Sequence, residues 1–388
     1  MKLFDNTEVA FALKSDSQLE RAYFLFKMIQ NQPLVKIGST ITKFALKIHL
    51  PIKAIIRATV FDHFCGGINE DDCLPIIDKM HLEGKVHSVL DYSVEGKEEE
   101  KSFDEALQKI IKILYFCEEK KSIPFAVFKP TGFGRFALYQ KISEGKTLTS
   151  LEEEEWSRVK ARFHSVCKVA VEKDVPLLID AEESWMQDAA DELIEELMET
   201  YNSQKSVVFN TLQMYRHDRM FYLKALHKKA KEKGFHIGMK VVRGAYMEKE
   251  RERAEKYGYE SPICADKKTT DENYDAAIRY MMDNSNMALF AGTHNEESSY
   301  LVMDLAKKYQ INESDSRLWF GQLYGMSDHI SFNLAHKGYN VAKYLPFGPV
   351  RDVMPYLIRR AEENTSVAGQ TSRELNLLKT ERKRRKMS

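Results

Sequence analysis

The chain has 388 residues, of which 43% are hydrophobic and 30% charged, and its 58 basic residues are balanced by 58 acidic ones. This composition excludes a chain that is disordered throughout, and the neutral balance gives no general attraction to nucleic acid. Five scattered cysteines without CxxC spacing indicate a reducing compartment and argue against a structural zinc site.

Targeting signals are not visible in the first residues, which lack the basic and apolar regions of a secretory signal. They also lack the Arg-rich, acid-poor composition of a transit peptide, although a mitochondrial location stays open. No run of 18 uncharged apolar residues occurs, so we expect no membrane-spanning helix.

Residues 1–83 are expected to form an N-terminal helical segment. Helical periodicity runs over Ser17–Gln30 and Leu34–His49, with breaks at Pro33 and Pro51. The stretch from Leu34 to Phe61 is basic and amphipathic. We expect it to cover the protein's own core, and contact with an anionic membrane surface is the alternative.

From residue 84 the pattern changes, and short apolar runs alternate with longer charged helical segments. Eight runs read as strands: Val86–Leu90, Phe125–Phe128, Leu177–Ile179, Val207–Thr211, Ile237–Val242, Met287–Phe290, Leu318–Phe320 and Val341–Leu345. Nearly continuous apolar strands that alternate with helices indicate a parallel sheet. Eight such units predict an α/β fold, a distorted (β/α)8 TIM barrel over residues 84–370.

The predicted strands end in polar side chains. Active sites of such barrels lie at the carboxyl ends of the strands, so these side chains are the candidate site residues. They are Asp91, Lys129, Asp180, Gln213, Lys240 with Arg243 to Tyr246, Thr293 to Asn295, Gln322 and Tyr344.

After the last strand, Arg359 and Arg360 lie side by side on a predicted helix. The planar guanidinium matches a carboxylate with two hydrogen bonds, so the pair is a candidate carboxylate clamp. A solvated helix face with Glu363 three or four residues away is the alternative. Residues 371–388 form a basic C-terminal tail, in which we expect the basic run Lys379–Lys386 to be disordered and solubilising.

Two other kinds of chemistry must be weighed. Gly132, Gly134 and Ala137 match a dinucleotide-binding turn, but a helix follows where that unit would place a second strand. His294 lacks an HxH or HExxH partner, and we expect no metal site. Lys129 and Lys240 lie at barrel strands, where a lysine can form a Schiff base, so an aldolase-like enzyme stays open.

The ordered set of strand motifs resembles the proline dehydrogenase family. It comprises Phe-Lys129-Pro, Leu-Ile-Asp180-Ala-Glu182-Glu183, Leu-Gln213-Met-Tyr, Lys240-Val-Val-Arg243-Gly244-Ala245-Tyr246, Gly-Thr293-His294-Asn295, Gly321-Gln-Leu-Tyr-Gly325-Met and Tyr344-Leu-Pro-Phe-Gly followed by Arg359-Arg360 and Glu363-Asn364. The resemblance covers roughly residues 85 to 370. It implies a monofunctional, FAD-dependent enzyme that oxidises L-proline to 1-pyrroline-5-carboxylate, the first step of proline catabolism.

For the substrate, the resemblance implies that Arg359, Arg360 and Lys129 bind the proline carboxylate, while Tyr344 packs against the ring. Glu363 is expected to fix one of the guanidinium groups. Asp180 and Lys240 are the expected catalytic residues. Asp180 is expected to pair with a cation or to steer the substrate amine, and Lys240 to place a positive charge beside the flavin.

For the cofactor, the resemblance implies that Gln213 hydrogen-bonds the flavin ring. The other expected FAD contacts are Ala181, Arg243, Gly244, Ala245, Thr293 and His294. Two positions depart from the family's pattern. Relatives often have Arg where Lys240 stands and an aromatic residue where Met247 stands, so stacking on the adenine is in doubt.

The resemblance also implies the rest of the reaction. A hydride passes to flavin N5, and the electrons go on to a membrane quinone. We therefore expect a cytoplasmic protein with peripheral contact at the inner membrane and no nucleic-acid partner. Hydroxyproline is the competing substrate, and the bulk of Tyr344 favours proline.

Overall fold

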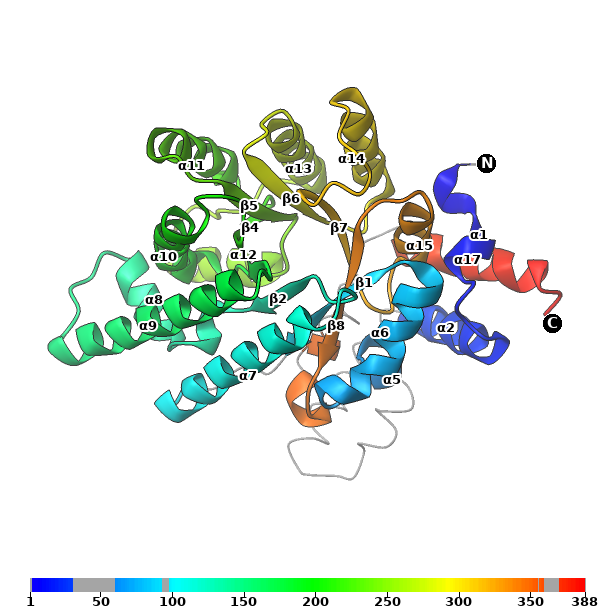
Figure 1. Ribbon diagram of the computed structural model, residues 1–388, viewed down its shortest axis with the longest axis horizontal. Coiled ribbons are helices and arrows are strands. Elements are labelled where there is room, and N and C mark those ends of the chain that lie inside the picture. The colour runs from blue at the N-terminus through cyan, green and yellow to red at the C-terminus, as the bar shows by residue number, and fades with distance from the viewer. Residues whose placement is uncertain (1, 31–59, 93–97, 355, 359–369, 388) are drawn as a thin grey trace. The chain divides into compact units, whose positions relative to one another are not determined.

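The computed structural model describes residues 2–30, 60–92, 98–354, 356–358 and 370–387. Its eight strands form a closed barrel in which β1 to β8 follow one another in chain order (Figure 1). The strands are β1 (His87–Tyr92), β2 (Phe125–Phe128), β3 (Leu177–Ile179), β4 (Val208–Gln213), β5 (Ile237–Val242), β6 (Met287–Gly292), β7 (Leu318–Leu323) and β8 (Val341–Phe347). The predicted (β/α)8 barrel is thus confirmed.

Several strands continue further than the sequence predicts. β4 extends to Gln213, β7 extends to Leu323, and β8 extends past Leu345 to Phe347. A barrel strand alternates between inward and outward side chains, so a polar residue at the strand's carboxyl end can still belong to the ladder. The apolar pattern therefore ends before the hydrogen-bonded strand does.

Helices precede β1, connect the strands and follow β8. They are η1 (Leu3–Asp5), α1 (Thr7–Ala10), α2 (Asp16–Ile29), α5 (Asp62–Phe64), α6 (Glu70–Gly84), α7 (Glu100–Glu118), η3 (Pro130–Gly132), α8 (Phe136–Ser143), α9 (Ser150–Glu172), α10 (Ser184–Tyr201), α11 (Arg219–Lys233), α12 (Met247–Tyr257), α13 (Lys267–Met282), α14 (Glu296–Lys308), α15 (Asp328–His336) and α17 (Gln370–Arg384). No helix in the described part of the chain is both long and apolar enough to cross a membrane.

The chain forms two compact units. The first unit comprises residues 1–95 and 321–388, and the second unit comprises residues 96–320. The division into a helical segment 1–83, a barrel 84–370 and a tail 371–388 stays a prediction. The predicted helix Leu34–His49 lies outside the described residues, as does nearly all of the amphipathic stretch that contains it.

In the second unit, β2 to β6 are parallel and hydrogen-bonded in sequence order. All residues of β4 are buried, as expected for a parallel strand that is covered on both faces. Phe125 at the start of β2 contacts three aromatic rings edge-on, with centroids 5.8 Å away in Phe209, 5.4 Å in Phe290 and 5.1 Å in Trp319. These rings fill the barrel interior near the amino ends of the strands.

In the first unit, β1 pairs with β8, and Val89 stands opposite Tyr344. The C-terminal helix α17 packs against α1 and α2. Its leucines share a buried cluster with the N-terminal helices, made of Ala10, Phe11, Leu19, Ala22, Phe26, Leu375, Leu377 and Leu378. The expectation of disorder from Lys379 onward is therefore wrong as far as Arg384, because these residues belong to α17.

The charges of α17 explain why its composition is misleading. Each of four arginines lies beside an acidic residue of the N-terminal segment. The pairs are Arg373 with Asp5 (2.6 Å), Arg382 with Glu20 (2.6 Å), Arg384 with Glu8 (3.3 Å) and Arg385 with Asp16 (3.0 Å). The sequence suggests that this basic run is solvated. In the structure its arginines instead form ion pairs with acidic residues near the N-terminus.

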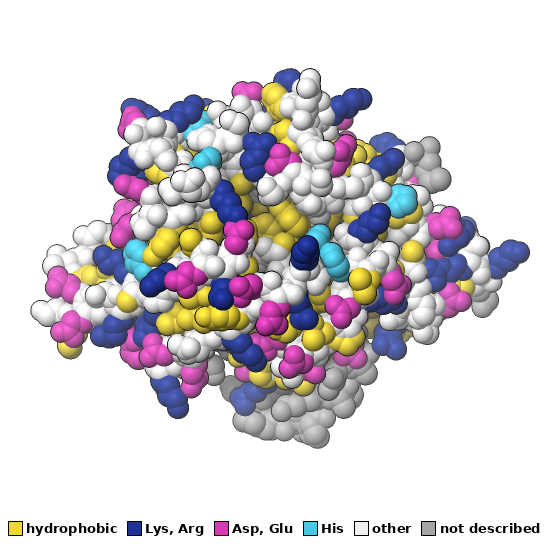
Figure 2. Space-filling model, in the orientation of Figure 1, with side chains coloured by type: hydrophobic (Ala, Val, Ile, Leu, Met, Phe, Trp, Pro, Cys, Tyr) yellow, Lys and Arg dark blue, Asp and Glu magenta, His cyan; other side chains and the backbone are white. Residues whose placement is uncertain are grey.

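Basic and acidic side chains are mixed over the face shown in Figure 2. This mixing agrees with the equal numbers of basic and acidic residues in the chain.

Candidate functional site

The second unit carries most of the predicted site residues at the carboxyl ends of its strands. Neighbouring parallel strands end at the same edge of a sheet, so these side chains gather there. Lys129 follows β2, Asp180 and Ala181 follow β3, Gln213 ends β4, Lys240 lies within β5, Arg243 to Ala245 follow β5, and Thr293 and His294 follow β6.

Lys240 and Asp180 form an ion pair, in which the ammonium donates to Oδ1 of the carboxylate. Both side chains are mostly buried, with 8% and 17% of their areas exposed. β3 and β5 both border β4, so the pair spans the end of that strand. A Schiff-base lysine needs a free amine that faces the carbonyl compound, whereas the Lys240 amine donates to the Asp180 carboxylate. The geometry therefore argues against the aldolase alternative at Lys240.

Arg243 is held in place by three hydrogen bonds and an aromatic ring. Its Nε donates to Oδ1 of Asp271 (2.6 Å), and Nη1 and Nη2 donate to the hydroxyls of Thr293 (2.9 Å) and Ser298 (3.0 Å). The guanidinium carbon lies 4.4 Å from the centre of the Tyr274 ring. Two predicted cofactor residues, Arg243 and Thr293, are thus in direct contact.

Asp271 is a member of this group that the sequence did not identify. Burial acts to raise the pKa of Asp271, but hydrogen bonds from Lys267 and Arg243 hold it below its ordinary value. The residue lies on α13, between strands, where an acidic side chain looks like any solvated one. No local pattern marks it as a partner of Arg243.

Gly244 shows why the loop after β5 needs a glycine. Its φ of 131° is a conformation that L side chains rarely adopt, and an added Cβ would lie 2.6 Å from carbons of the Tyr215 ring. The Tyr215 N–H donates to the carbonyl of Arg243 over 2.7 Å. The loop at Arg243 and Gly244 therefore packs closely against Tyr215, just after the end of β4.

This donor set fits FAD. Three of the five N–H groups of the Arg243 guanidinium donate to Asp271, Thr293 and Ser298. A guanidinium held in this way suits the phosphate oxygens of the cofactor. The buried amide of Gln213 supplies both a donor and an acceptor for a heteroaromatic ring.

Glu182 is a second residue whose role the sequence did not show. It is 6% exposed, and its two oxygens accept the N–H (2.9 Å) and the hydroxyl (2.7 Å) of Thr131. Burial raises its pKa to about 7, against the opposing effects of the Thr131 hydrogen bonds and the Lys129 charge.

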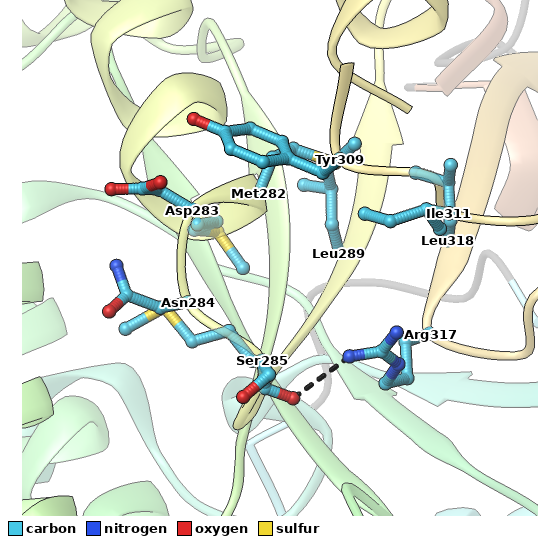
Figure 3. A pocket seen from close by; sticks show the side chains of 11 residues that line it. Met282, Asp283, Asn284, Ser285, Leu289, Tyr309, Ile311, Arg317 and Leu318 are labelled. Carbon is cyan, nitrogen blue, oxygen red and sulfur yellow. Dashed lines mark hydrogen bonds between the residues drawn. The ribbon is translucent and has the colours of Figure 1, made fainter. Parts of the chain in front are cut away.

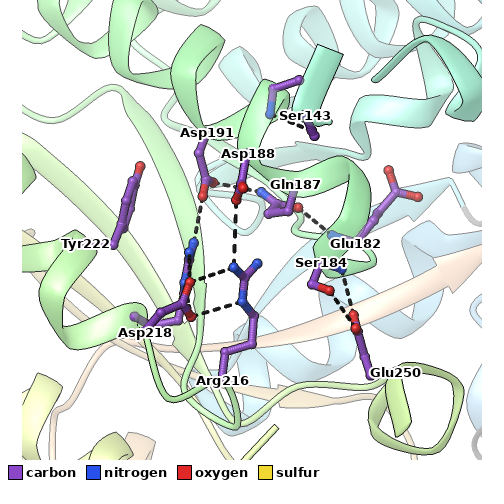
Figure 4. Close-up of polar contacts among 12 residues, drawn as sticks. Ser143, Glu182, Ser184, Gln187, Asp188, Asp191, Arg216, Asp218, Tyr222 and Glu250 are labelled. Carbon is purple, nitrogen blue, oxygen red and sulfur yellow. Dashed lines mark hydrogen bonds and ion pairs between the residues drawn. The ribbon is translucent and has the colours of Figure 1, made fainter. Parts of the chain in front are cut away.

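A buried polar network supports the start of α10 (Figure 4). The Glu182 N–H donates to Gln187 (2.8 Å), whose amide donates to Asp191 (2.8 Å), which in turn accepts from Arg219 (2.7 Å). Asp218 accepts from Arg216 and Arg219. Burial opposes the ionisation of Asp218, yet the two arginines hold its pKa well below its usual range.

The remaining predicted substrate residues belong to the first unit. Tyr344 is buried within β8, and its carbonyl accepts the Tyr324 N–H over 2.8 Å. Arg359, Arg360 and Glu363 lie outside the described residues. The carboxylate clamp therefore stays a prediction.

A cavity of about 220 Å³ lies at the opposite ends of the strands, against the first residues of β6 and β7 (Figure 3). Buried Met282 and Leu289 and the partly exposed Tyr309 are among its lining residues. Its one cationic residue, Arg317, is bonded to the Asp315 carboxylate and to the Ser285 carbonyl, 3.0 Å away. None of the predicted site residues lines this cavity.

Metal chemistry has no support in the part of the chain that the structure describes. No group of three or more His, Cys, Asp or Glu side chains there could hold an ion. The Asp180, Glu182 and Glu183 carboxylates instead bind Lys240, Thr131 and Lys249.

Comparison with known proteins identifies the family. Residues 74–373 match the family described as proline dehydrogenase. The mitochondrial proline dehydrogenase 2 of Arabidopsis thaliana is 32% identical over 377 residues, which cover 86% of this chain and 79% of the relative. The carbapenem antibiotics biosynthesis protein CarD of Pectobacterium carotovorum subsp. carotovorum is 37% identical over 300 residues, which cover 76% and 77%.

The solved structures agree with the fold. Proline utilization A from Bdellovibrio bacteriovorus, in a form inactivated by N-propargylglycine, aligns with a TM-score of 0.72 at 22% identity. The alignment covers 93% of this chain but only 38% of that longer chain, and at this identity the likeness shows the fold. Because the family match spans most of the sequence, the chain belongs to the proline dehydrogenase family.

Proposed function

We propose that this enzyme oxidises L-proline to 1-pyrroline-5-carboxylate, the first step of proline catabolism, with FAD as cofactor and a quinone as the electron acceptor. The family match supports this reaction, and so do two bonded pairs at the carboxyl ends of the strands. One pair, Asp180 with Lys240, consists of the two residues that the sequence predicts for catalysis. The other pair, Arg243 with Thr293, consists of two residues that it predicts for cofactor binding. These two contacts, between Lys240 and Asp180 and between Arg243 and Thr293, are the observation that carries the proposal.

When bound, FAD would supply the acceptor for the hydride that leaves the carbon next to the proline nitrogen. The residues of this chain orient the substrate for that step, and such orientation supplies a large share of the rate gain. Lys129, Arg359 and Arg360 bind the carboxylate, Glu363 fixes a guanidinium, and Tyr344 packs against the ring.

Around the cofactor, Gln213 binds the flavin ring, and Arg243 with Thr293 and His294 binds the rest of the molecule. Gly244 and Ala245 allow the backbone to approach closely, and Ala181 leaves room at the end of β3. Lys240 holds a positive charge at the flavin, and Asp180 keeps that charge in place. A membrane quinone as acceptor agrees with a cytoplasmic enzyme that contacts the inner membrane peripherally.

An anaerobic absorbance spectrum before and after L-proline tests the function. The purified protein should be yellow, and proline should bleach the flavin bands. A colourless preparation that takes up no FAD would contradict the proposal. A yellow protein that proline does not bleach would point to another substrate, and trapping by borohydride with a carbonyl compound would point to an aldolase.

A biosynthetic role is the second candidate, because the relative CarD is named for antibiotic biosynthesis at 37% identity. Growth separates the two roles. A bacterial strain without proline dehydrogenase should grow on proline as its sole nitrogen source when it carries this gene. Failure to grow, with active enzyme present in the cells, would favour the biosynthetic role.

A further inference from the structure

Glu182 lies beside the turn that carries Lys129 and ties that turn down with both of its oxygens. We infer that Glu182 is a positioning residue. By holding the turn, it fixes the position of Lys129, the cation that receives the substrate carboxylate. The inference rests on the proposed function, because it assigns Lys129 to substrate binding. Its structural half, that Glu182 holds the turn, can be tested without substrate.

The turn begins where β2 ends. Lys129 is followed by η3, in which the Gly132 N–H donates to the Lys129 carbonyl over 2.9 Å. Thr131, two residues after Lys129, donates its N–H and its hydroxyl to opposite oxygens of Glu182. A carboxylate that accepts two bonds from one residue fixes that residue in both position and orientation.

Further contacts hold the same turn. The buried Tyr139 hydroxyl donates to the Pro130 carbonyl over 2.8 Å. Arg162 donates to the Phe133 carbonyl over 3.1 Å. The Glu182 contact differs from these two, because the positive charge of Lys129 is close enough to lower the pKa of Glu182 against the effect of burial.

Glu182 is itself fixed from the other side. Its N–H donates to Gln187, and Gln187 is bonded to Asp191 within α10. Glu182 thus binds the Lys129 turn through its carboxylate and the buried network of α10 through its backbone N–H. A side chain anchored in this way can hold a ligand-binding group within a few tenths of an ångström.

The protonation state of Glu182 bears on this role. The charges of Lys129 and Glu183 act on the pKa of Glu182, and burial and the charge of Glu182 in turn raise the pKa of Tyr139. Burial raises the Glu182 pKa to about 7, whereas the Thr131 bonds and Lys129 favour the charged form. Protonation turns one Glu182 oxygen into an O–H donor and removes the charge that strengthens both Thr131 bonds, so the turn should loosen as the pH falls below 7.

The chain offers a matched control. Glu250 is fully buried and accepts the N–H and the hydroxyl of Ser184, both over 2.6 Å, in the same two-bond arrangement. Glu250→Gln therefore removes the same kind of contact at a serine that carries no predicted cation. It should leave the KM for L-proline unchanged.

Kinetics test the functional half. Glu182→Gln and Thr131→Val should each raise the KM for L-proline about tenfold, the effect of losing roughly one net hydrogen bond, while kcat changes less. Thr131→Ser keeps the hydroxyl and should behave like the wild type. In a Lys129→Met background, Glu182→Gln should raise KM no further. An equal increase in both backgrounds would overturn the inference.

Hydrogen exchange followed by mass spectrometry tests the structural half without catalysis. The peptide containing Thr131 should exchange faster in Glu182→Gln than in the wild type or in Glu250→Gln. Unchanged exchange in Glu182→Gln would overturn the inference whatever the kinetics show. If the wild type does not oxidise proline, the proposed function fails, and exchange still decides whether Glu182 holds the Lys129 turn.

Discussion

Lys240 and Asp180 form an ion pair between β5 and the end of β3, and most of both side chains is buried. The sequence predicts both residues as catalytic but does not show that they are partners, since 60 positions separate them. The pairing means that removing either charge takes the counter-charge away from a largely buried side chain. This coupling can be measured.

Lys240→Met and Asp180→Asn should each lower the free energy of unfolding by about 3 kcal/mol, the cost of breaking a largely buried ion pair. The double variant should lose less than the sum of the two, because it leaves no unpaired charge. Denaturant unfolding of the four proteins gives this coupling energy. Additive losses would show that the two residues do not stabilise each other. Lys240→Arg, which keeps a cation, should retain most of the stability.

Arg243 should be required for FAD retention. Arg243→Met removes the guanidinium that Thr293, Ser298 and Asp271 hold, and the dissociation constant for FAD should rise about 10- to 100-fold, as for loss of a charged hydrogen-bonding group. Quenching of flavin fluorescence on titration of the apoprotein measures this constant.

Lys267→Met is the matched control for Arg243→Met. Lys267 is bonded to the same Asp271 carboxylate, but 63% of its side chain is exposed. Losing such an exposed pair should change FAD affinity less than about twofold. Equal weakening in both variants would mean that the charge near Asp271, and not the Arg243 contact, determines FAD binding.

Prediction of this fold from the sequence succeeds where burial alone dictates the pattern. Phe125–Phe128, Leu177–Ile179 and Ile237–Val242 are predicted with the bounds that the structure gives, because each is a nearly uninterrupted apolar run. Gln213 shows where that signal ends. It is a polar, buried residue that completes β4, and its place in the ladder follows from the neighbouring strands.

The partners of charged residues could not be predicted, because they come from distant elements. Asp271 approaches Arg243 from a helix 28 positions away, and Glu20 meets Arg382 from 362 positions away. Composition makes α17 look like a solvated tail, and only the closed fold reveals its acidic partners. For the same reason the two bonds between Glu182 and Thr131 could not be predicted from the sequence.

Glu182 should make the stability of the protein depend on pH. Its folded pKa, about 7, lies above the ordinary value of 4.5, so ionisation is unfavourable in the folded state. The stability linked to a raised pKa is present below 4.5 and is lost as the pH rises through 7. Glu182→Gln cannot ionise and should not show this loss.

The unfolding free energy of Glu182→Gln relative to the wild type should therefore increase between pH 4.5 and pH 7, the two pKa values. The increase should reach roughly 3 kcal/mol, from about 1.4 kcal/mol for each unit of pKa. Thermal unfolding at a series of pH values measures it. Exposed Glu154→Gln serves as the control, with an expected change below about 0.5 kcal/mol. A difference independent of pH would contradict burial as the cause of the raised pKa.

Asp328 should be the most costly carboxylate to remove from the first unit. Its two oxygens lie 2.9 Å from Nζ of Lys14 and 2.7 Å from Nζ of Lys343, and Lys343 is almost fully buried. Burial acts to raise the pKa of Asp328, but the two lysines hold it well below its ordinary value of 3.8. Asp328→Asn leaves the buried Lys343 and the partly exposed Lys14 without their shared counter-charge and should cost about 3–5 kcal/mol at neutral pH.

The pH dependence gives a second, independent check on Asp328. A lowered folded pKa stabilises the protein above the unfolded value, and that stability is lost as the pH falls below 3.8. The difference between wild type and Asp328→Asn should therefore shrink in acid. Asp71→Asn, an exposed carboxylate that is likewise in the first turn of a helix, should cost less than about 1 kcal/mol. If Asp328→Asn cost no more than Asp71→Asn, the lysines would not depend on Asp328 for their charge balance.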